Sequence, residues 1–149
     1  MLKRIFSLTI AVLIISLLTI GSFAADNGIT VIINGVVIDF DVPPQIINNR
    51  TMVPVRKAFE VLGAQVEWSE EMSLALATYK TDIIAIPIGE NSFSVTNVIT
   101  NETRTVGLDV PAQIVNSRTL IPLRAISEAL GKQVLWDGTT STAYINDIK

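Results

Sequence analysis

Acidic, basic and aromatic side chains are the groups with which this 149-residue chain could do chemistry, because it contains no histidine and no cysteine. Their absence excludes an imidazole base, a thiolate nucleophile, a disulfide and the usual zinc and iron–sulfur ligand sets. Asp39 and Asp41 stand two residues apart, on one face of a strand, as the paired carboxylates of a glycosidase would. The alternative is that Asp41, which lies close to Pro43 in the sequence, is a turn residue. The sequence has no Gly-rich phosphate loop or calcium loop, so we expect no catalytic residues, no cofactor and no metal site.

Two arginines and two tryptophans are the candidate contacts to a ligand or partner. Arg50 and Arg118 each follow a turn rich in Asn and Ser. Such residues either hold the turn or form a polar rim for a sugar or peptide. Trp68 and Trp136 each end a predicted strand, where an indole can stack on a sugar ring. Because both also follow an apolar helix in the sequence, we expect them to be core residues.

The amino terminus has the anatomy of a secretory signal. Two basic residues precede an apolar run over residues 5–20. Ser22 and Ala24 are small, as a signal peptidase requires, so we predict a signal peptide over residues 1–24. A retained membrane anchor is the alternative, because a span needs roughly 20 apolar residues.

The exported part of the chain is predicted to be acidic. Removal of the signal would change the formal charge from −3 to −5. Nucleic acids and other phosphate polymers are bound through clustered Lys and Arg, whereas the cations here are scattered singly. Nucleic-acid binding is therefore not expected, and without disulfides the core alone, or a partner, must hold the fold together.

The chain contains an internal repeat. Aligned on itself with an offset of 68 residues, it has 16 identities over the 28 positions of residues 41–68 and 109–136. We call these stretches the first and second aligned segments. Such self-similarity indicates two structural units of about 60 to 70 residues, which we place at residues 25–90 and 91–149. Each is small enough to be marginal alone, so we expect the two to share an interface.

Each unit is predicted to consist of strands around one helix. Asn34-Gly35 favours a type I′ hairpin turn. A helix is predicted over residues 55–62, because a proline stands at its start and Gly63 just after its end. It has one apolar face, and Arg56 and Glu60, like Arg124 and Glu128 in the second aligned segment, are spaced for an ion pair. The predicted fold class is α+β, with two tandem repeats that are each an antiparallel β-sheet of about five strands packed on one short α-helix. The expected strands are 30–33, 36–40, 52–53, 64–68, 74–79, 82–88, 92–100, 104–108, 133–136 and 142–145.

The first aligned segment combines Asp-Val-Pro-Pro, Asn-x-Arg-Thr followed by two hydrophobic residues and Pro, a two-turn helix ending in Leu-Gly, and Val-x-Trp. This combination resembles the copper amine oxidase N-terminal-like domain, also called the stalk domain, in two tandem copies from about residue 29 onwards. The resemblance implies secreted or surface proteins of mostly Gram-positive bacteria. In the oxidases, a separate domain with copper-binding histidines and a tyrosine-derived quinone does the chemistry. Because this chain has no histidine, and Tyr79 and Tyr144 match no cofactor motif, copper chemistry is not implied.

Three functions remain open at this point. The preferred one is a secreted, non-catalytic interaction or scaffold module that acts at the cell wall or on a surface protein through loops and sheet edges. The second is a glycan or small-molecule binding protein that uses Arg50, Arg118, Trp68 and Trp136. The third is a hydrolase with Asp41 as a catalytic carboxylate. We expect a cell-wall polymer or surface protein as partner and no stable membrane insertion after signal cleavage. The oligomeric state is left open.

Overall fold

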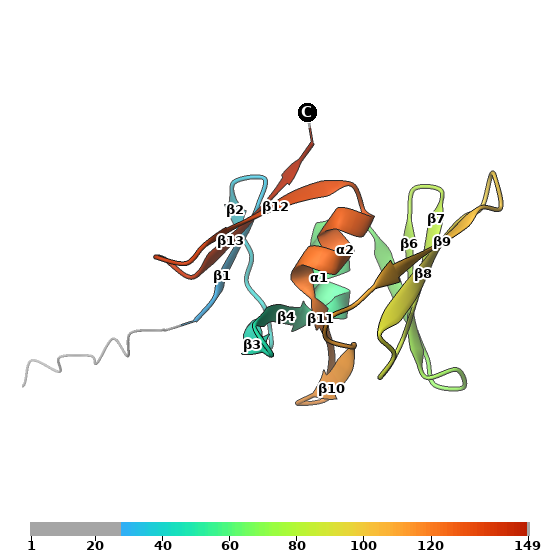
Figure 1. The fold of residues 1–149 in the computed structure, drawn as a ribbon, viewed down its shortest axis with the longest axis horizontal. Helices are drawn as coiled ribbons and strands as arrows, with labels where there is room; N and C mark the ends of the chain where they lie inside the picture. Colours follow the sequence, from blue (N-terminus) through green and yellow to red (C-terminus); the bar gives the residue numbers. More distant parts are fainter. Residues whose placement is uncertain (1–27, 149) are drawn as a thin grey trace, which may run out of the picture.

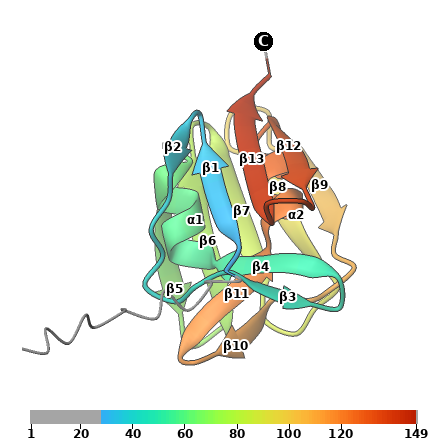
Figure 2. The ribbon, with the colours of Figure 1, turned by 90° about the vertical axis from the view of Figure 1, so that its left-hand side faces the viewer.

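The structure is a computed structural model that describes residues 28–148, and the predicted signal peptide lies outside them. Two larger sheets face each other with both helices between them, and a third sheet of short strands closes one end (Figures 1 and 2). The elements are β1 (Thr30–Ile33), β2 (Val36–Val37), β3 (Gln45–Ile47), β4 (Arg50–Pro54), α1 (Val55–Val61), β5 (Gln65–Ser69), β6 (Leu74–Tyr79), β7 (Asp82–Pro87), β8 (Ser92–Asn97), β9 (Thr103–Gly107), β10 (Gln113–Val115), β11 (Arg118–Pro122), α2 (Leu123–Ala129), β12 (Lys132–Asp137) and β13 (Thr142–Asp147).

Both larger sheets contain strands from the two halves of the sequence. The five-stranded sheet has the order β5-β6-β7-β8-β9, so β7 before residue 90 pairs with β8 after it. The four-stranded sheet has the order β12-β13-β1-β2 and joins the beginning of the described chain to its end. An α+β fold with several antiparallel sheets is therefore present. The expectation that each repeat forms a sheet of its own is wrong, because a hairpin from each half extends the sheet of the other half.

One strand pair is parallel, although only antiparallel pairing was expected. β1 runs parallel to β13, with Thr30 opposite Thr142 and Ile33 opposite Ile145. In the five-stranded sheet, β7 lies between β6 and β8, so every neighbour is antiparallel. No strand lies between β13 and β1, and the two therefore meet directly in the parallel direction.

The third sheet has the order β10-β11-β4-β3, and its two central strands join the two halves of the chain. β4 and β11 pair antiparallel with Val53 opposite Ile121, which are equivalent positions of the two aligned segments. β3 and β10 were not predicted, and each forms a hairpin with the following strand. Their turns have positive φ at both central residues, which is the type I′ geometry that Asn tolerates: Asn48 and Asn49 in one, Asn116 and Ser117 in the other.

The helices begin and end as predicted, to within one residue. α1 starts after Pro54, and Gly63 adopts a φ of +92° just beyond its end. The predicted apolar faces are buried in one core that extends over both halves of the chain. They comprise Val55, Ala58, Phe59 and Leu62 in the first half, and Leu123, Ile126 and Leu130 in the second. Neither helix in residues 28–148 is long and apolar enough to cross a membrane.

A polar cluster ties the end of β13 to the β1–β2 turn. Asn34 Nδ2 donates to Asp147 Oδ2 at 3.1 Å, and the Asp147 backbone N–H donates to Asn34 Oδ1 at 3.2 Å. Lys132 Nζ forms an ion pair with the same carboxylate. Hydrogen bonding between these two side chains raises the pKa of Lys132 and lowers the pKa of Asp147. The cluster therefore reinforces the only sheet that joins the first described strand to the last.

Candidate functional site

Two ion pairs link the halves of the chain crosswise. Arg118 Nε donates to Asp41 Oδ2 at 2.7 Å, and Arg50 Nε donates to Asp109 Oδ2 at 2.8 Å. Asp41 and Asp109 are equivalent positions in the two aligned segments, and so are the two arginines. The pairs are therefore the same contact made in opposite directions, which gives the recurring Asp and Arg a structural role.

The arginines also fix the turns that precede them. Arg50 Nη1 donates to the Asn49 carbonyl at 3.1 Å, and Arg118 Nη1 donates to the Ser117 carbonyl at 3.3 Å. Both pairs are solvent-exposed, and exposed ion pairs stabilise a fold only weakly. They mainly orient the two hairpin turns against the opposite half.

The pKa of Asp41 reports on this contact. The hydrogen bond from Arg118 lowers the pKa of Asp41 below its ordinary value of 3.8. A lowered folded-state pKa contributes stability that is present above the unfolded-state pKa and is lost as the pH falls through the folded-state pKa. We therefore expect Arg118→Gln to return the Asp41 pKa toward 3.8 and to weaken this acid dependence, as followed by carboxyl-carbon NMR titration. Arg50→Gln is the matched control and should leave Asp41 unchanged; identical Asp41 titration in all three proteins would contradict the assignment.

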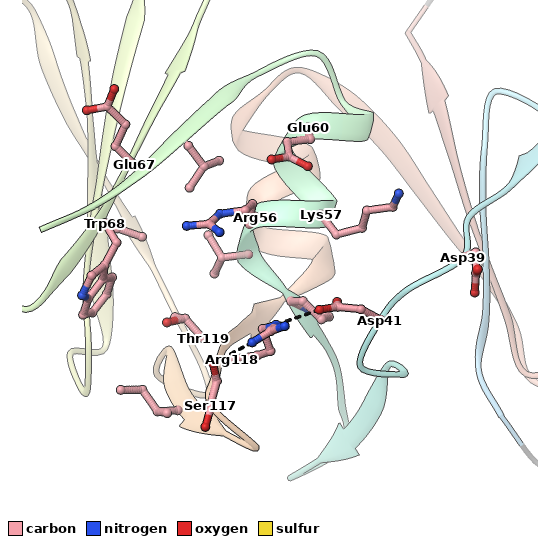
Figure 3. A pocket seen from close by; sticks show the side chains of 15 residues that line it. Asp39, Asp41, Arg56, Lys57, Glu60, Glu67, Trp68, Ser117, Arg118 and Thr119 are labelled. Carbon is pink, nitrogen blue, oxygen red and sulfur yellow. Dashed lines mark hydrogen bonds and ion pairs between the residues drawn. The ribbon is translucent and has the colours of Figure 1, made fainter.

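A groove of about 800 Å³ runs along α1, and we call it the α1 groove. Figure 3 shows Trp68 on one wall, Asp39 on the other, α1 between them, and the Asp41–Arg118 pair at one end. Its walls come from β5, from the segment after β2, and from β10 and β11 of the second half. The lining residues are Asp39, Asp41, Pro54, Val55, Arg56, Lys57, Glu60, Val66, Glu67, Trp68, Ala75, Ile114, Ser117, Arg118 and Thr119.

The tryptophans are exposed, so the expectation that they belong to the core is wrong. Trp68 is 38% exposed and Trp136 is 43% exposed. β5 and β12 are edge strands of their sheets, and these two side chains lie outside the buried cluster between the sheets. Trp68 lines the α1 groove, where an indole face is available for stacking or cation–π contact.

The equivalent position along α2 holds a smaller groove of about 270 Å³, the α2 groove, whose lining residues include Arg50, Arg104, Asp109, Arg124, Glu128 and Ala129. Of the four predicted contact residues, the structure thus brings Arg118 and Trp68 to one groove and places Arg50 at the other. Trp136 lines neither groove. The predicted helix ion pair is present in α2, where Arg124 Nε lies 3.9 Å from Glu128 Oε1. In the described chain no such pair joins Arg56 to Glu60.

The side chains of the α1 groove are suited to contacts with a ligand. The carboxylate of Asp41 is engaged by Arg118 and has a lowered pKa, so at neutral pH it cannot donate the proton that a carboxylate hydrolase needs. Among residues 28–148 there is no group of three His, Cys, Asp or Glu side chains placed to hold a metal ion. The α1 groove instead offers an exposed indole with charged groups of both signs around it, which is the equipment of a recognition site.

Several lining residues were missed from the sequence. Lys57 and Glu67 have no counterpart of the same type in the second aligned segment, where Ala125 and Leu135 stand. This difference between the segments was the available signal, because a charge present in only one copy is not required by the shared fold. Ile114 was missed since β10 was not predicted.

The profile of the family described as copper amine oxidase N-terminal domain matches residues 32–145 as one stretch. The match includes both aligned segments and both grooves. None of the curated protein sequences that were compared matches the chain.

Proposed function

The chain belongs to the copper amine oxidase N-terminal domain family, and from this membership we propose that it is an exported, non-catalytic interaction module of the bacterial cell surface or cell wall. The N-terminal domain of copper amine oxidases is a non-catalytic, stalk-like domain. By this proposal the whole protein is non-catalytic, and its role is to bind a partner.

The α1 groove is the observation that carries this proposal. Its volume of about 800 Å³ lies within the roughly 300–1,000 Å³ typical of ligand sites. It also contains an exposed tryptophan, which is a residue type enriched where proteins bind one another or sugars. The groove therefore supports an interaction role more directly than the outer surfaces of the sheets do.

The sequence supports the location and the origin that we propose. Residues 1–24 have the signal-peptide pattern, which makes the protein secreted, and the cell wall or another surface protein then becomes its partner. The two aligned segments support descent from a duplicated unit, with copies over residues 25–90 and 91–149. The exchange of hairpins between sheets is consistent with such an origin, because two copies of one unit can trade equivalent strands.

A glycan or small-molecule binding protein is the second candidate. It is favoured by Trp68 and Arg118, which line the same groove. An indole face stacks on a sugar ring, while a guanidinium donates hydrogen bonds to hydroxyl or carboxylate oxygens. The guanidinium of Arg118 is, however, already engaged by Asp41.

Sedimentation with isolated cell-wall sacculi tests the proposed function. The protein is recovered from the medium of a Gram-positive host that expresses the full chain, and its amino terminus is sequenced. We expect a terminus at Ala25 and pelleting with untreated sacculi at physiological salt. Binding that survives removal of wall proteins would indicate a glycan partner, and binding lost with those proteins a surface protein. A protein that stays in the cells, or that pellets with neither preparation, would overturn the proposal.

A further inference from the structure

A cationic side chain of the chain itself lines the α2 groove and bonds to the end of α2. Arg104, on β9, extends over the end of α2, and its Nη2 donates to the carbonyl of Ala129 at 2.5 Å. Ala129 is the last residue of α2, and a cation there interacts favourably with the free carbonyls of the helix. Glu128 lines the same groove. One guanidinium of the chain therefore satisfies a helix end and lies in a groove with a carboxylate.

Among residues 28–148, the α1 groove has no arginine at the position equivalent to Arg104. The position equivalent to Arg104 is Val36, which is 63% exposed, and the position equivalent to Ala129 is Val61, the last residue of α1. β2 has two residues, whereas its counterpart β9 has five and packs against α2. At this position the first half therefore lacks the cation that the second half has, and the strand that contains the position is shorter.

The two grooves also differ in charge: the α1 groove has a surplus of carboxylates, and the α2 groove has a surplus of cations. In the α1 groove, with the Asp41–Arg118 pair set aside, three carboxylates face two cations: Asp39, Glu60 and Glu67 against Arg56 and Lys57. In the α2 groove, Arg50 pairs with Asp109 and Arg124 with Glu128, which leaves Arg104 as an additional cation. The α1 groove therefore complements a ligand that brings one positive charge.

The wall formed by β5 favours an extended peptide over a sugar. β5 is an edge strand that pairs only with β6, and it lines the groove with Val66, Glu67 and Trp68. A strand edge presents unpaired N–H and C=O groups that an incoming strand can bond. The Trp68 ring lies on the same wall and can attract a cationic side chain through its π face.

We propose that the α1 groove is a docking site for an extended segment of a partner protein that carries an arginine or lysine, whose cationic group binds in the groove that Glu60 lines, as Arg104 lies in the groove that Glu128 lines. This inference rests on the proposed function as an interaction module and specifies the chemistry of its partner. The backbone of the segment pairs with β5, and its basic side chain reaches the carboxyl end of α1.

The chain itself supplies a probe for this site. A blocked peptide with the sequence of residues 102–107, Glu-Thr-Arg-Thr-Val-Gly, contains the arginine that lines the α2 groove. It is titrated into the ¹⁵N-labelled protein while the indole N–H signals of Trp68 and Trp136 are followed by NMR. We expect the Trp68 signal to move and the Trp136 signal to stay. The same peptide with Gln in place of Arg should bind at least about tenfold more weakly, since a charge-assisted hydrogen bond is lost.

Two variants make the test specific. Val36→Arg places the missing cation on the chain itself and should weaken peptide binding at least about tenfold. Because Val36 is exposed, the variant should unfold at the same urea concentration as the unchanged protein. Glu60→Gln should weaken binding of the arginine peptide and leave binding of the glutamine peptide unchanged. Equal affinity for both peptides, or no effect of either variant, would overturn the proposal.

The test also separates this inference from the proposed function. An oligosaccharide of N-acetylglucosamine is titrated in parallel, and movement of Trp68 with the sugar but not with the peptide would overturn peptide docking and make the groove a glycan site. Pelleting with sacculi without any peptide response would leave the surface role standing and refute the docking site alone. A specific peptide response without export would refute the surface role alone.

Discussion

Neither half of the chain, residues 25–90 or 91–149, is expected to unfold cooperatively when it is produced alone. Each half would lose the sheet neighbours that the other half supplies. β1 would lose β13, and β7 would lose β8. The β4–β11 pair at the centre would separate as well. A fragment of about 60 residues is already marginal, so exposing these strand edges and half of one continuous core should leave no folded monomer.

Circular dichroism during urea unfolding checks this expectation, with the undivided chain as reference. We expect no sigmoidal transition for either half, and recovery of a single transition when the halves are mixed in equal amounts, because the missing strands are then supplied in trans. Analytical ultracentrifugation of the mixture should give a one-to-one complex. A cooperative transition of an isolated half, with dispersed NMR signals of a monomer, would show that the repeats fold independently.

The sequence was sufficient for features that depend on neighbouring residues. Asn34-Gly35 adopts the left-handed geometry expected of a type I′ turn, since positive φ is inexpensive for these two types. The helix over residues 55–61 follows from its apolar spacing and from Gly63. Such signals lie within a few residues of one another, so a single sequence contains them.

Strand partnership could not be predicted in the same way. An edge that β7 offers is chemically the same whether the next strand comes from its own repeat or from the other. The exchange of hairpins is decided by long-range packing, and short strands such as β3 and β10 are too brief for alternation to reveal them. Their Asn48-Asn49 and Asn116-Ser117 turns were the only local signal.

The candidate site was predicted in its residue types more than in its arrangement. Trp68 and Arg118 were chosen for their chemistry, and they do line one groove. The expected burial of Trp68 failed because β5 turned out to be a sheet edge, a property that depends on which strands pair. The crosswise pairing of Asp41 with Arg118 was likewise hidden, since the two residues are 77 positions apart.

The helices differ at two adjacent buried positions. Ala58 and Phe59 of α1 correspond to Ile126 and Ser127 of α2, and all four are essentially inaccessible to solvent. The bulky side chain therefore lies one residue later in α1 than in α2. Ser127 also buries a hydroxyl for which no hydrogen-bond partner is found in the described chain. At equivalent positions, α1 thus contributes a buried phenyl ring to the core, whereas α2 contributes a small polar side chain.

Phe59→Ala should accordingly be among the most damaging single substitutions in this protein. Phe59 is 0% exposed, and removing a fully buried phenyl ring costs about 3–5 kcal/mol in transfer and cavity terms, against a total stability of about 5–15 kcal/mol for a typical domain. Urea unfolding measures the loss. Ser127→Ala, at the equivalent position of α2, is the matched control and should raise the free energy of unfolding by about 1 kcal/mol, because an unsatisfied buried hydroxyl is removed. A loss below about 1 kcal/mol for Phe59→Ala would mean that the core closes around the deletion, and a loss on Ser127→Ala would mean that its hydroxyl is hydrogen-bonded in solution.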